Sequence, residues 1–174
     1  MYCFNFIAMK KVFFFILLAI TCGCNDGDLQ IETLDFDSVS METCTTATTS
    51  TTIFFKINDD EALILDLESG LFKNEVSDGS ISSSIPSESN LLYRIFSDSV
   101  DDDYFCDAIP TTEPRVTDEI EALSGDVLIT TTQLDSITYQ HTIQLSEISL
   151  MNSNGERITD LTINEFGTFT TTAN

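Results

Sequence analysis

The chain contains no tryptophan, a single histidine and only seven lysine and arginine residues in 174. The lack of tryptophan excludes the disulfide–tryptophan core of antibody domains and leaves little surface for stacking sugar rings. A multi-histidine metal site is excluded because His141 stands alone, and its apolar neighbours in the sequence indicate a packed or edge histidine. The seven basic residues face 29 acidic ones, a net charge of −22 that excludes nucleic-acid binding.

Sequence motifs of common enzyme classes are also missing. The chain has no Gly-x-Gly-x-x-Gly, no phosphate-binding loop and no Gly-x-Ser-x-Gly around a nucleophilic serine. Paired carboxylates could in principle hydrolyse glycosides, but the abundance of acidic residues singles out no pair. We therefore expect a protein that is not an enzyme, and a small hydrolase with paired carboxylates is an alternative.

An export signal occupies the N-terminal region. Lys10 and Lys11 precede an unbroken apolar run, residues 12–20. This run suits a signal peptide and is shorter than the roughly 20 residues of a membrane-spanning helix. We interpret residues 1–23 as a signal peptide, with Met9 as the alternative start.

The segment 9–28 resembles the signal of bacterial lipoproteins, in which a cysteine becomes the lipidated first residue of the mature chain. Cys24 follows Gly23 and precedes an acidic stretch that is similar to lipoproteins of the Bacteroidota. For Cys24, Thr21 stands where the lipoprotein pattern has an aliphatic residue. Cys22 is the alternative anchor. The resemblance implies an outer-membrane lipoprotein, periplasmic or surface-exposed, whose membrane partner is reached through a lipid on Cys24.

Downstream residues are similar to lipoproteins of flavobacteria, for instance Tyr104-Phe105-Cys106 followed by Ile109. That similarity implies no activity. Residues 24–30 are expected to form a lipidated tether and residues 31–174 a single domain, with a first strand at 31–36. Loss of the signal removes two lysines and leaves a net charge near −24.

The remaining cysteines form an even pair if Cys24 carries the lipid. Cys44 and Cys106 would then lie in an oxidising compartment, where a disulfide is the natural interpretation. Two unpaired buried cysteines are the alternative.

Strand patterns dominate the rest of the chain. Residues 53–57 and 62–67 flank an Asn-Asp-Asp turn and predict a hairpin, with Phe55 facing Leu63 and Leu65. Residues 137–145 alternate apolar and polar side chains, which predicts a half-buried strand that continues past a bulge. Residues 119–123 are expected to form one helical turn that ends at Gly125.

Seven to nine short strands at this spacing predict an all-β fold, an antiparallel β-sandwich. An immunoglobulin-like topology is the favoured version and a small β-barrel is the alternative.

An acidic loop supplies a candidate metal site. Calcium binds six to eight oxygen atoms, and clustered carboxylates in a loop can provide several of them. The candidate ligands are Asp98, Asp101, Asp102 and Asp103. A solvated acidic loop is the alternative, and no other cofactor is expected.

Composition and signal together favour a lipid-anchored, exported binding or structural module at the outer membrane. Its partner would be a protein or a glycan. The alternative to a free-standing module is an accessory subunit of an outer-membrane complex.

Overall fold

A computed structural model describes Leu34 and residues 36–109, 111–152, 155, 157–158 and 165–173 of the chain. The signal, Cys22, Cys24 and the tether lie outside these residues, as does most of the strand expected at 31–36. The elements are β1 (Ile53–Asn58), β2 (Glu61–Asp66), β3 (Ile81–Ile85), β4 (Asn90–Phe96), α2 (Asp103–Cys106), β5 (Val116–Gln133), β6 (Thr138–Met151), β7 (Arg157–Ile158) and β8 (Glu165–Thr172).

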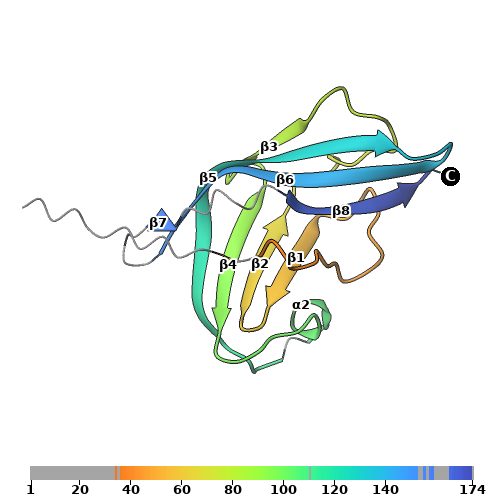
Figure 1. Ribbon diagram of the computed structural model, residues 1–174. Coiled ribbons are helices and arrows are strands. Elements are labelled where there is room, and N and C mark those ends of the chain that lie inside the picture. The colour runs from red at the N-terminus through yellow and green to blue at the C-terminus, as the bar shows by residue number, and fades with distance from the viewer. Residues whose placement is uncertain are drawn as a thin grey trace, which may run out of the picture.

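The strands pair into one antiparallel sheet in the order β1-β2-β4-β5-β6-β7, with β3 paired to β5 and β8 to β6. The long strand β5 belongs to both halves of this sheet (Figure 1). We call β1, β2, β4 and the start of β5 half A, and the rest of β5 with β3, β6 and β8 half B. The sheet curls as a half-barrel, which confirms the all-β prediction. The sandwich, its immunoglobulin-like topology and the small barrel stay predictions.

The curl is made by an irregularity between β5 and β6. The pairing register shifts on both sides of Ser124, and Gly125 next to it adopts φ 134°. A Cβ on Gly125 would lie 2.6 Å from Ile148 Cδ1 and 2.9 Å from the Ser146 carbonyl, so glycine is required here. Such bulges bend a strand and increase its twist, which turns half A into half B. The bulge predicted in β6 is thereby confirmed.

The helical turn predicted at 119–123 is wrong, because these residues lie inside β5. Ile120 and Ala122 are buried while Glu119, Glu121 and Leu123 are exposed. Glutamate, alanine and leucine favour helices, but pairing with β4 overrides that local preference.

The main core lies between the two halves. Half A contributes Phe54, Leu63, Leu65, Leu91 and Tyr93, and half B contributes Val127, Ile129, Ile143, Leu145 and Phe166. Phe36 closes one side, with its ring in an edge-to-face contact 6.3 Å from Tyr93. No helix among the described residues is long and apolar enough to cross a membrane.

A second, smaller cluster covers the outer side of half A. Phe55, Ala62 and Ile64 point away from the main core and meet residues of the 96–106 region. Phe105 of α2 stacks on Phe55 with ring centroids 4.8 Å apart. β1 and β2 therefore bury apolar residues on both faces, which explains why such residues follow one another directly, as Phe54-Phe55 in β1 and residues 62–65 in β2.

The hairpin predicted at 53–67 is confirmed, but the prediction of shared faces is wrong. Phe55 pairs with Ile64 and belongs to the second cluster, whereas Leu63 and Leu65 belong to the main core. Both faces of this hairpin are apolar, so the sequence alone could not distinguish them.

Candidate functional site

The outer face of half B is partly exposed to solvent and consists mainly of hydroxyl and amide side chains. We call it the polar face. It comprises Ser82 and Ser84 of β3, Asp126, Leu128, Thr130 and Thr132 of β5, Thr138, Gln140, Thr142 and Gln144 of β6, and Thr168, Thr170 and Thr172 of β8. The alternate residues on these strands, such as Val127, Ile129 and Ile143, are buried in the core.

Strand register arranges these side chains in rows across the sheet. Thr130 lies opposite Thr142, and Thr142 lies opposite Thr168. The next row places Gln140 between Thr132 and Thr170. Threonine is β-branched and suits a pleated surface, so the same residues that build the strands present regular hydroxyl groups.

Asp126 is the one carboxylate among these residues, and exposed Glu165 lies opposite Gln144 at the edge of the face. Serine side chains hold Asp126. Asp126 Oδ1 accepts hydrogen bonds from Ser82 Oγ at 3.2 Å and Ser84 Oγ at 2.9 Å. Hydroxyl and amide groups both donate and accept hydrogen bonds, whereas ionised carboxylates only accept. The polar face can therefore satisfy the hydrogen-bonding groups of a neutral partner that is rich in hydroxyls. The rest of the surface suits such a partner poorly, because the chain has a net charge of −22.

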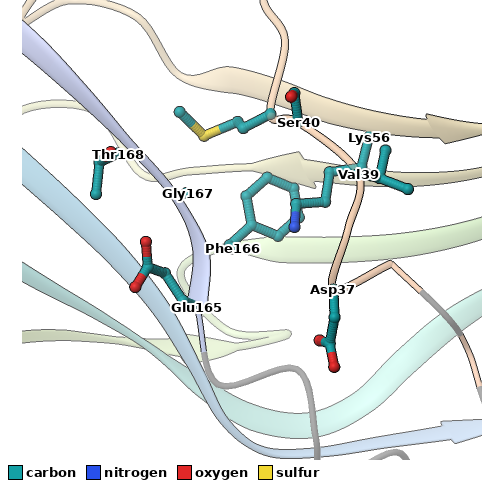
Figure 2. A pocket seen from close by; sticks show the side chains of 9 residues that line it. Asp37, Val39, Ser40, Lys56, Glu165, Phe166, Gly167 and Thr168 are labelled. Atoms are coloured by element: carbon teal, nitrogen blue, oxygen red, sulfur yellow. The ribbon is translucent and has the colours of Figure 1, made fainter.

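A pocket of about 580 Å³ opens between β1 and β8. These two strands do not pair with each other, and residues 37–41 lie between them. Its lining consists of Asp37, Val39, Ser40, Met41, Lys56, Glu165, Phe166, Gly167 and Thr168 (Figure 2). Met41 packs tightly on β8, since a Cβ on Gly167 would lie 2.6 Å from Met41 Cβ.

Lys56 is the buried cation of this pocket, with a relative exposure of 3%. Its Nζ donates a hydrogen bond of 2.9 Å to the Phe36 carbonyl and lies 5.6 Å from the centre of the Phe166 ring. Burial lowers the pKa of Lys56, and the nearby carboxylates of Asp37 and Glu165 oppose that shift. In Figure 2, Asp37 and Glu165 lie on opposite sides of the Phe166 ring.

His141 is fully buried in half B, so it is the packed of the two alternatives that the sequence left open. Its Nδ1 and Nε2 lie 2.8 Å from Thr131 Oγ1 and Thr171 Oγ1. Thr171 donates its hydroxyl proton to Asn74 Oδ1 at 2.6 Å, so its oxygen accepts from His141. Nε2 therefore carries the ring proton, and Nδ1 accepts from Thr131. With both nitrogens engaged and rings of Phe72 and Phe169 around it, His141 is structural.

This burial predicts a loss of stability in mild acid. Burial lowers the pKa of His141. Below a pH of about 6.5, the unfolded chain therefore binds a proton at this residue that the folded chain does not bind. The contribution of neutral His141 to the free energy of unfolding is fully present above that pH and is lost as the pH falls through the folded-state pKa. We expect the free energy of unfolding, measured in urea, to fall between pH 7.5 and 5.5 by more in the wild type than in His141→Gln. Equal losses in both proteins would contradict this assignment.

The candidate calcium ligands lie on the loop after β4 and at the start of α2, where all four are exposed. Asp98 accepts a hydrogen bond from the backbone N–H of Ser99. Asp107, Asp101 and Asp102 raise the pKa of Asp103 by charge repulsion. Within the described residues, no three His, Cys, Asp or Glu side chains converge to hold a metal ion. Calcium binding stays a prediction from sequence.

Cys44 and Cys106 form a disulfide in the structure, with Cα atoms 5.1 Å apart.

Neither the polar face nor Lys56 was predicted from the sequence. A signal for Lys56 was present, because it interrupts the apolar run Ile53-Phe54-Phe55 before Ile57. The Thr and Gln positions between 138 and 144 were recognised as solvent-facing, but the matching rows on β5 and β8 require the strand order.

No protein-family model, no curated protein and no solved structure matches this chain.

Proposed function

We propose that the protein is a lipid-anchored, exported binding module at the outer membrane, and that its polar face binds a neutral polysaccharide. The lipoprotein-like segment 9–28 with Cys24 supports the location. The observation that carries the binding role is the rows of threonine and glutamine on a solvent-facing, four-stranded surface of a chain with net charge −22. Asp126 is the one carboxylate among the described residues that define this face, and Glu165 lies at its edge.

Contact with the polysaccharide would rest on hydrogen bonds. The large apolar side chains exposed among the described residues are aliphatic or methionine, so no exposed phenylalanine ring offers a stacking platform. Hydrogen bonds exchanged with water contribute roughly 1 kcal/mol each, which makes binding by one copy weak. Several anchored copies on one membrane would bind a repetitive polymer together and raise the overall affinity.

The test is affinity electrophoresis with soluble polysaccharides. We expect a neutral glucan, xylan or mannan to retard the protein, and alginate or chondroitin sulfate not to. The triple variant Thr132→Val, Thr142→Val and Thr170→Val keeps shape and strand preference but removes hydroxyls from three strands. It should lose retardation while its melting temperature changes little.

The matched control is Thr112→Val, which removes an exposed hydroxyl outside the polar face and should bind like the wild type. Retardation by none of the neutral polymers, or unchanged retardation of the triple variant, would reject the proposed binding surface.

A further inference from the structure

Within the described part of the chain, Lys56 is a buried lysine with no ion-pair partner. The ion pairs within the described residues are Arg94–Glu119 and Arg115–Glu113, and neither involves Lys56. An ammonium group has three donor hydrogens, and the protein acceptor found for Lys56 Nζ among the described residues is the Phe36 carbonyl. A buried charge with spare donors is costly unless a counter-charge completes it.

A carboxylate is the group that completes such a site. It accepts charge-assisted hydrogen bonds from an ammonium and fits beside the Phe166 ring at the base of the pocket. The hydroxyl groups of Ser40 and Thr168 also line the pocket and offer additional donors.

The walls impose a second requirement. Asp37 and Glu165 are exposed, lie on opposite sides of the ring and act electrostatically on Lys56. Together with Lys56 they give the pocket a net negative charge, which repels a simple anion. A ligand that carries both a carboxylate and an ammonium group can pair with Lys56 at the base and with Asp37 or Glu165 at the walls.

We propose that this pocket binds a small zwitterion of the amino-acid type. The ligand carboxylate contacts Lys56 Nζ, and the ligand ammonium faces Asp37 or Glu165. A volume of about 580 Å³ lies within the usual range for small-molecule sites and accommodates an amino acid with its side chain. Thr168 belongs both to the polar face and to the lining of this pocket, but Thr132, Gln140, Thr142 and Thr170 lie outside the lining. The proposed zwitterion site can therefore be tested separately from polysaccharide binding.

The experiment is a titration calorimetry series with the twenty standard L-amino acids, each at millimolar concentration, on the purified domain with its disulfide intact. Each amino acid that binds is then compared with its analogues lacking the amino group or the carboxyl group. We expect at least one amino acid to bind, and both analogues to bind roughly tenfold or more weakly. Binding by none of the twenty would overturn the proposal.

Lys56→Met separates a ligand-binding role from a structural one. The variant removes the ammonium and keeps an unbranched side chain of similar length. We expect roughly ten- to a hundredfold weaker binding. Its melting temperature should change little, because relief from burying a charge offsets the lost hydrogen bond to Phe36. Wild-type affinity in this variant would overturn the assignment.

The double variant Asp37→Asn and Glu165→Gln tests the walls. Removing both negative charges should weaken amino-acid binding and strengthen binding of the deaminated analogue, because Lys56 then dominates the pocket. The matched control, Glu75→Gln with Asp78→Asn, changes two exposed acids outside the lining. An equal response from the control would show a general charge effect and reject the zwitterion site.

Discussion

Replacing Cys44 and Cys106 by serine is expected to lower the free energy of unfolding by about 4 kcal/mol. The bridge joins residues separated by 62 positions, and closing a loop of that length in the unfolded chain carries roughly this effect. The bridge also holds α2 against half A, where Phe105 stacks on Phe55. Urea unfolding of the double variant and the oxidised wild type, followed by circular dichroism, measures the difference.

Hydrogen exchange then locates the loss. We expect backbone amides around Phe55 and Ile64 to lose protection, because their cover is no longer tethered. Amides of β6 near Ile143 lie in the other half and should keep more of theirs. The reduced wild type serves as the control for the substitutions themselves, because it lacks the bridge and keeps both cysteines. A double variant within about 1 kcal/mol of the wild type would show that the bridge is dispensable for stability.

Prediction of the fold succeeded where one face of a strand is buried and the other is exposed to solvent. Residues 138–145 alternate strictly, and the structure places them in β6 with His141, Ile143 and Leu145 inward. The turn at Asp59 also behaved as predicted, since Asp59 adopts φ 57° between β1 and β2. In these places local pattern and tertiary burial agree.

Prediction failed where burial is two-sided or where strand pairing overrides local preference. Phe55 could not be assigned a face because α2, distant in sequence, covers the outer side of β1. The helical turn predicted at 119–123 failed because the alternation of Ile120 and Ala122 becomes visible only once β4 is known to pair there. Both errors come from contacts between segments far apart in sequence.

The two candidate binding surfaces were hidden for the same reason. The polar face needs β5, β6 and β8 side by side, although β6 and β8 are separated along the chain by a long connection. The pocket needs residue 37, Lys56 and Glu165 brought together at a seam where β1 and β8 remain unpaired. Single residues of each surface are visible in the sequence, but their proximity is not.

Replacing Cys24 by serine is expected to move the protein from the membrane fraction to the soluble fraction. In the lipoprotein interpretation this thiol carries the lipid, and an acidic domain with net charge near −24 has no electrostatic attraction to anionic headgroups. From residue 24 to Leu34, an extended chain reaches at most roughly 35 Å, so the anchor would keep the domain close to the bilayer. Expression in a bacterium that processes lipoproteins, followed by ultracentrifugation and mass spectrometry of the N-terminal peptide, measures both location and modification.

Cys22→Ser is the matched control, because it removes the neighbouring thiol and leaves Cys24 in place. We expect this variant to stay in the membrane fraction and to carry lipid on Cys24. The Cys44–Cys106 disulfide should form in both variants, since neither substitution touches the pair. Release of Cys22→Ser together with retention of Cys24→Ser would assign the anchor to Cys22. That result would leave Cys24 as an odd thiol and remove the argument that pairs the anchor with the disulfide.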